Sequence, residues 1–124
     1  MATERLDLTI NGGRSAPVRA RTALKAFDGS LGECRGDVQL LVTELVTNAV
    51  VHAGADSDTS IGIRVEAAPD AIRAEISYPG PRFEAQPRPE EQKFGLYLVD
   101  QLADRWGSEP TDEQNRTWFE LDRA

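Results

Sequence analysis

One stretch near the middle of the chain constrains the fold more than any other, because its apolar residues recur at the spacing of an α-helix. They lie three and four positions apart, which is typical of an amphipathic helix with one buried face. These residues are Val38, Leu41, Val42, Leu45, Val46, Ala49, Val50 and Ala53. The spacing predicts a helix from about Gly36 to Ala53, and Gly54 is expected to end it.

Three polar residues form a second, narrower line on this predicted helix. Glu44, Asn48 and His52 follow one another at intervals of four, so they share one side of the helix beside the apolar stripe. An amide oxygen can ligate a hard cation such as Mg²⁺, while a carboxylate one turn away can orient a nucleophile. The pattern favours a phosphate site. The alternative from spacing alone is a half-exposed helix whose polar residues face water.

Alternation of apolar and polar residues predicts the strands of a sheet. The five predicted strands lie at residues 6–10, 61–65 and 72–76, around Trp106, and at 116–121. The first is expected at a sheet edge. The second and third flank Ala68-Pro69-Asp70, which predicts an antiparallel hairpin of central strands. A polar turn from Pro110 to Asn115 is expected before the last strand.

Two further helices are predicted. Ser15 is a candidate N-cap with Pro17 in the first turn. The apolar face of this helix would consist of Val18, Ala20, Ala23, Leu24, Ala26 and Phe27. Asp28 to Gly36 is predicted as a loop. Helical spacing returns from Phe94 to Asp104. Its inward face would consist of Leu96, Val99, Leu102 and Ala103.

The segment before the last helix has the features of a functional loop. Pro79 to Lys93 contains four prolines, mixed charge and no apolar periodicity, and loops of this length are uncommon in compact domains. Gly95 then leaves backbone N–H groups open to an anion at the start of the helix, although a glycine can also simply begin a helix. The order of elements predicts one sheet covered by helices.

Size and charge narrow the classes of function. With 124 residues, the chain is expected to form one domain over residues 1–124 with a single core. Its 14 basic and 21 acidic residues give a net charge of −7, which opposes a phosphate backbone and argues against nucleic acid as the main ligand. A protein or a small molecule is the expected partner.

The sequence also gives an expectation for location. Cys34 is the only cysteine, so no disulfide can form within the chain. The first residues lack a basic start followed by a long apolar run, and no stretch approaches the length that spans a membrane. We therefore expect a cytoplasmic protein without membrane contact.

Three segments carry a resemblance to a known family. Glu44 to Ala53 resembles the N box of the histidine-kinase-like ATPases, the GHKL superfamily with the Bergerat nucleotide fold. Gly95 to Gly107 is similar to the second glycine box and following helix of the small bacterial anti-sigma-factor serine/threonine kinases, and Thr117 to Leu121 is similar to their closing strand. These segments occur in family order from about Asp37 onward. The resemblance implies an α+β two-layer sandwich: a mostly antiparallel sheet of about five strands covered on one face by about three helices.

The resemblance also implies a site for ATP and Mg²⁺. Asn48 would hold the metal, and Glu44 would be the catalytic residue that orients the hydroxyl of the protein substrate. Gly95 and Leu96 would bind the phosphates at the start of their helix. The segment from Pro79 to Lys93 would be the ATP lid.

Two glycine boxes depart from the family pattern. ATP-binding members carry Asp-x-Gly-x-Gly, whose carboxylate accepts the adenine amino group. Here Tyr78 stands at the aspartate, Gly80 at the first glycine and Arg82 at the last glycine. Lys93 replaces the first glycine of the second box, so that only Gly95 remains there. Arg82 and Lys93 could grip phosphates instead, or could be solvated charges of the lid.

Two functions remain open at this point. The first is an ATP-dependent serine/threonine protein kinase that sequesters a sigma factor and phosphorylates a small anti-sigma antagonist protein. The second is a non-catalytic regulator that keeps the fold and the protein-binding surface but binds ATP weakly or not at all. The partners implied are a sigma factor, the antagonist protein or both, and a homodimer is left open. The catalytic part of a sensor histidine kinase would need a phosphoacceptor histidine on a separate helical dimerisation segment. His52 is the sole histidine and lies inside the N box, so this third function is rejected for this chain alone.

Overall fold

The computed structural model describes residues 3–79, 96–109 and 113–123 as a single antiparallel sheet with helices on one side. The sheet has the strand order β1-β2-β3-β5-β4, and every neighbouring pair is antiparallel. The strands are β1 (Glu4–Asn11), β2 (Ser60–Ala67), β3 (Ala71–Pro79), β4 (Arg105–Ser108) and β5 (Gln114–Asp122). The edge position of β1 and the central hairpin of β2 and β3 are as predicted.

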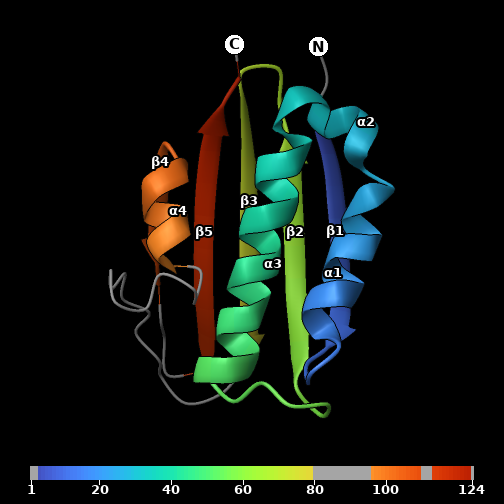
Figure 1. The fold of residues 1–124 in the computed structure, drawn as a ribbon, viewed down its shortest axis with the longest axis vertical. Helices are drawn as coiled ribbons and strands as arrows, with labels where there is room; N and C mark the ends of the chain where they lie inside the picture. Colours follow the sequence, from blue (N-terminus) through green and yellow to red (C-terminus); the bar gives the residue numbers. More distant parts are fainter. Residues whose placement is uncertain (1–2, 80–95, 110–112, 124) are drawn as a thin grey trace.

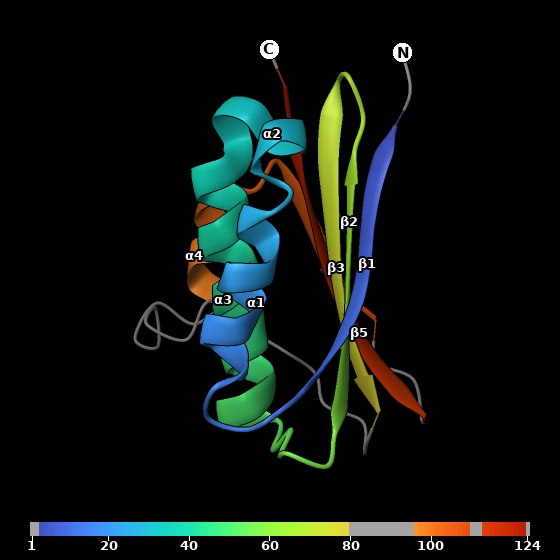
Figure 2. The same ribbon diagram turned by 90° about the vertical axis from the view of Figure 1, so that its right-hand side faces the viewer.

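The helices cover one face of this sheet and leave the other face open (Figures 1 and 2). They are α1 (Ala16–Lys25), the single turn α2 (Asp28–Leu31), α3 (Arg35–His52) and α4 (Leu96–Leu102), with a short 3-10 helix at Gly32–Cys34. This arrangement confirms the expected α+β two-layer sandwich, and it is consistent with the Bergerat ATPase fold.

Alternating burial along the strands explains how the two layers meet. The inward residues of β2 and β3 are almost fully buried, and their neighbours face the open side. These inward residues are Ile61, Ile63, Val65, Ile72, Ala74 and Ile76. The apolar face of α3 packs on them with Val38, Leu41, Val42, Leu45, Val46 and Ala49, all buried. Gly54 follows α3 with a φ of 75°, a left-handed conformation that glycine adopts without strain.

The segment from Asp28 to Gly36 was predicted as a loop, and this prediction is wrong. The carbonyl of Phe27 accepts hydrogen bonds from the N–H groups of Ser30 and Leu31, which closes the turn of α2. Leu31 is fully buried and anchors that turn to the core. Gly32 then redirects the chain with a φ of 58°. Gly32 therefore marks the junction between the α2 turn and the short 3-10 helix.

Three residues assigned to the predicted apolar helix faces are exposed instead. Ala26 is exposed because it lies just beyond the end of α1 at Lys25. Val18 is 57% exposed because the buried face of α1 consists of Ala16, Ala20 and Leu24, and a residue two positions from Ala16 points about 200° away. Leu102 is 42% exposed because α4 ends there, beyond the part of the helix that packs on the core. No helix in the described ranges is both long and apolar enough to cross a membrane.

Candidate functional site

Buried polar side chains gather at one end of the space between the sheet and the helices. Among the described residues, the buried polar side chains are Asn48, Asn115 and Thr117, and Tyr78 is buried with the apolar core. Tyr78 lies directly opposite Asn115 on neighbouring strands, and Thr117 lies two residues further along β5. The C-terminal half of α3, the end of β3 and the start of β5 lie at the same end of the molecule (Figure 1). We call these four residues the polar corner.

The three polar residues predicted to share one side of α3 differ in exposure to solvent. Asn48 is only 7% exposed, Glu44 is half-buried and His52 is exposed. Burial raises the pKa of the Glu44 carboxyl above its ordinary value. Within the described part of the chain, no cation or hydrogen-bond donor pairs with this carboxylate. Among the described residues, nothing therefore competes with a proton for this carboxylate, which lies one helical turn from a buried amide.

Tyr78 adds a neutral polar group to the corner. Its side chain is 5% exposed, and burial raises the pKa of the phenol to about 12. The hydroxyl therefore stays protonated at neutral pH, where it can donate or accept a hydrogen bond but carries no charge. Tyr78 therefore does not supply the negative charge of the aspartate that ATP-binding members of the resembling family carry at this position.

The remaining predicted site residues divide into two groups. Gly80, Arg82, Lys93 and Gly95 lie outside the described residues, as does the predicted lid apart from Pro79. Leu96 is the first residue of α4, and its side chain is buried in the core, where it contributes apolar packing. Helix α4 contacts α3. The roles assigned to these residues stay predictions.

Asn115 and Thr117 received no site role in the sequence analysis. Asn115 was assigned to a polar turn, but β5 already begins at Gln114, which places Asn115 inside a strand. The sequence does contain a pattern that indicates this strand. Its buried residues recur at every second position. They are Asn115, Thr117, Phe119 and Leu121. Thr117 already lies in the predicted strand, and continuing its alternation two residues toward the N-terminus reaches Asn115.

The potential metal ligands at the polar corner suit a metal ion that binds together with a nucleotide. No group of three or more His, Cys, Asp or Glu side chains able to hold a metal occurs in the described ranges. Mg²⁺ usually takes one or two protein ligands and completes its coordination with substrate phosphates and water. The buried amide of Asn48 suits the role of one such ligand. The residues therefore fit a metal–nucleotide complex better than a separate metal site.

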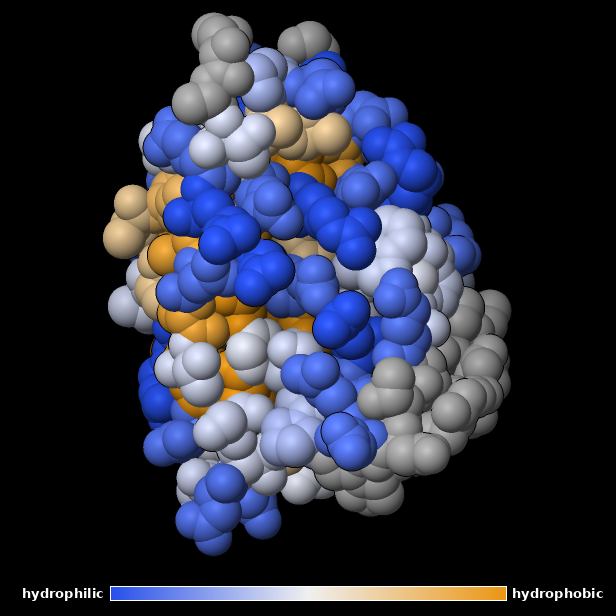
Figure 3. Space-filling view, turned by 180° about the vertical axis from the view of Figure 1, so that it is seen from behind, coloured by the Kyte–Doolittle hydropathy of each residue, from blue (hydrophilic) through white to orange (hydrophobic). Residues whose placement is uncertain are grey.

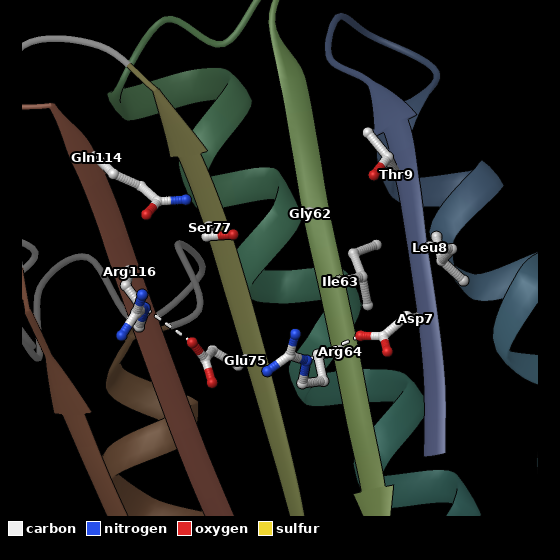
Figure 4. Close-up of a pocket in the computed structure, with 10 residues that line it drawn as sticks. All are labelled: Asp7, Leu8, Thr9, Gly62, Ile63, Arg64, Glu75, Ser77, Gln114 and Arg116. Carbon is white, nitrogen blue, oxygen red and sulfur yellow. Dashed lines mark hydrogen bonds and ion pairs between the residues drawn. The ribbon is translucent and has the colours of Figure 1, made fainter.

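A recess lies on the open face of the sheet, where hydrophilic residues cover much of the surface (Figure 3). This hollow of about 570 Å³ forms where Gly62 and Ser77 lie side by side among longer side chains (Figure 4). Its charges are already paired. Nε of Arg64 lies 2.8 Å from Oδ1 of Asp7, and the Arg116–Glu75 pair is equally close. This balance gives the recess no preference for a phosphate, so the polar corner is the stronger candidate.

An antiparallel sheet covered on one face by helices, with an acid–amide pair on the central helix, is the arrangement expected of a nucleotide-binding domain of the GHKL class. Comparison with known protein families matches residues 15–121 to the histidine kinase-like ATPase domain. The match spans most of the chain, so the chain belongs to this family. ATP and Mg²⁺ are the ligands that membership implies in general. No curated protein matches the chain.

Proposed function

We propose that this domain is an ATP-dependent serine/threonine protein kinase of the anti-sigma-factor type, which acts on a small anti-sigma antagonist protein and so regulates transcription. The observation that carries the proposal is the pairing on α3: the half-buried carboxylate of Glu44, which no described residue pairs with, lies one turn from the buried amide of Asn48. Partial desolvation of a carboxylate is unfavourable, so its place beside a buried amide supports a functional role for both groups.

The proposed roles follow from burial and charge. Burying a charge without a partner is costly, so the neutral polar corner suits the nucleoside, and the triphosphate belongs at the more exposed side near Glu44. Mg²⁺ bound with the nucleotide would neutralise phosphate charge, with the amide oxygen of Asn48 as one of its ligands. The Glu44 carboxylate would accept the proton of the attacking seryl or threonyl hydroxyl. A raised pKa makes this carboxylate a stronger base.

Phosphotransfer can be tested with purified antagonist proteins as acceptors and γ-labelled Mg-ATP. We expect the native chain to label serine or threonine on one acceptor. Glu44→Gln should lower the rate about 100-fold or more while ATP binding persists, because the general base is lost and the shape is kept. Glu33→Gln is the matched control, because it removes an exposed acid outside the polar corner. An unchanged rate in Glu44→Gln would contradict the assigned role.

A second function is favoured by one specific observation. The buried ring of Tyr78 occupies space at the position where the resembling kinases carry a smaller carboxylate. This substitution supports a non-catalytic regulator that keeps the fold and the partner surface but binds ATP weakly or not at all. The sigma factor and the antagonist protein are the proposed partners in either case. Both functions place the protein in the bacterial cytoplasm, where transcription occurs.

A further inference from the structure

We infer that the outer side of helix α1 is a docking surface for an acidic, partly apolar segment of a partner protein. The surface consists of Val18, Arg21 and Lys25, with Arg14 in the turn just before the helix, and we call it the basic face. The inference rests on the proposed function only for the identity of the partner, which would be the sigma factor or the antagonist protein.

Helix geometry places the helical residues of the basic face on one line. Val18, Arg21 and Lys25 are separated by three and four positions, so they lie within about 60° of one another around the helix axis. All three are exposed. The buried side of α1, centred about 130° away, packs into the core with Ala16, Ala20 and Leu24. Because α1 lies beside α3 in the layer that covers the sheet (Figures 1 and 2), the basic face is on the outside of that layer.

The cations of the basic face have no partner within the described part of the chain. No carboxylate there pairs with Arg14, Arg21 or Lys25. By contrast, every described arginine outside residues 14–21 is paired with a carboxylate or a backbone carbonyl. The whole chain has a net charge of −7, so this helix is a local exception. Its unpaired cations can attract the carboxylates of a partner.

Val18 favours a protein segment over a phosphate polymer. Its side chain is 57% exposed on the same line as Arg21 and Lys25. An apolar side chain gains from burial against another apolar side chain, which a phosphate backbone does not offer. The net charge of −7 also repels a polyanion as a whole, whereas a short segment with a few carboxylates is repelled little beyond the Debye length of about 8 Å. The basic face therefore suits an amphipathic segment in which acidic residues flank an apolar one.

A defined peptide tests this surface on the intact chain. The probe is a fluorescent amphipathic helical peptide in which glutamates flank leucines on one face, and binding is measured by fluorescence anisotropy at physiological salt. We expect saturable binding that weakens at least about ten-fold in Arg21→Glu and about three-fold or more in Val18→Ser. Lys25→Glu, with the same expected loss as Arg21→Glu, keeps the test decisive if thermal melting shows that Arg21→Glu is unfolded.

Arg19→Glu is the matched control. It makes the same change of charge at an exposed, unpaired arginine of the same helix, but Arg19 points at least about 100° away from each helical residue of the basic face. Its affinity for the peptide should stay within about three-fold of the native value, because salt screens charges that make no direct contact. Equal weakening by Arg19→Glu and Arg21→Glu would overturn the inference.

Other ligands separate the classes of partner. Tighter binding of a duplex oligonucleotide or of vesicles that contain phosphatidylserine than of the peptide would overturn the inference. Absence of peptide binding would overturn it as well, and would leave the proposed phosphotransfer standing. Peptide binding without binding of the sigma factor or the antagonist protein would overturn the proposed partners and support the basic face. If either protein binds, Arg21→Glu should weaken that binding at least about ten-fold and Arg19→Glu should not; an unchanged affinity in Arg21→Glu would overturn the inference.

Discussion

Tyr78 is the residue where the chain departs most clearly from the pattern it resembles. Tyr78→Asp would supply the carboxylate acceptor and remove the ring, and a hydrogen bond to a charged acceptor is worth about 1.5–3 kcal/mol. We therefore expect Mg-ATP to bind about ten-fold or more tightly in calorimetric titration. The same change removes a buried ring, so the free energy of unfolding should fall by about 2–4 kcal/mol.

Tyr78→Phe is the control for this substitution, because it keeps the ring and adds no acceptor. It should not improve ATP binding. Native affinity that is already tight, and that Tyr78→Asp leaves unchanged or worsens, would show that Tyr78 does not lie at the base-binding position.

The raised pKa of Glu44 predicts how the stability of the fold changes with pH. Burial raises the pKa of its carboxyl above the ordinary value of 4.5, so the folded state holds this proton more tightly than the unfolded state does. The contribution of Glu44 to stability is then present below pH 4.5 and is lost as the pH rises through the folded pKa. Glu44→Gln should remove this loss, so the melting temperature of the variant should gain on that of the native chain as the pH rises from 4 to 7.

Melting temperatures of both proteins across this range, in the same buffer series, test the prediction. Glu33→Gln, which changes an exposed carboxylate, serves as the comparison. A gap between the variant and the native chain that stays constant with pH would contradict the partly buried environment of Glu44.

Individual elements differ in how far the sequence predicted them. The strands and α3 could be predicted because each has an uninterrupted period of alternation or of three and four residues, and burial follows that period. The α2 turn could not, because a single buried leucine and backbone hydrogen bonds from Ser30 and Leu31 stabilise it. The polar corner depends on strand register: Tyr78 and Asn115 lie 37 positions apart in the sequence, and pairing of β3 with β5 brings them together.

A close contact between two loops supports the C-terminal end of α3. The N–H of Gly12 donates to the carbonyl of Thr59, and a Cβ at Gly12 would lie 2.5 Å from the carbonyl oxygens of Ala55 and Asp56. Backbone atoms this close cannot be displaced cheaply. Gly12→Ala should therefore lower the free energy of unfolding by about 1–3 kcal/mol in urea denaturation.

Gly29→Ala is the matched control, because a Cβ at Gly29 would have no atom within 4 Å. Since Gly29 lies in α2, alanine there should be neutral or stabilising by up to about 1 kcal/mol. Equal effects of the two substitutions would contradict the close approach of the loops.

The proposed phosphotransfer and the proposed partner binding are expected to depend on different parts of the molecule. Asn48 is buried between the layers, so it is not available to a protein surface. We expect Asn48→Ala to abolish phosphotransfer while leaving partner binding within about two-fold, because the substitution removes a metal ligand and little exposed area. A pull-down with the sigma factor and a phosphotransfer assay on the same preparation would measure both. Equal loss in the two assays would contradict this division of roles.

We propose that the polar corner and α3 hold a magnesium–nucleotide complex, which calorimetric titration of the native chain and Asn48→Ala with Mg-ATP would test. We expect saturable 1:1 binding by the native chain and binding at least about ten-fold weaker in Asn48→Ala, with thermal melting showing that the variant is folded. Asn11→Ala, an exposed change at the end of β1, should bind as the native chain does. No saturable heat with the native chain, or equal affinity in Asn48→Ala, would show that the polar corner and α3 do not hold this complex.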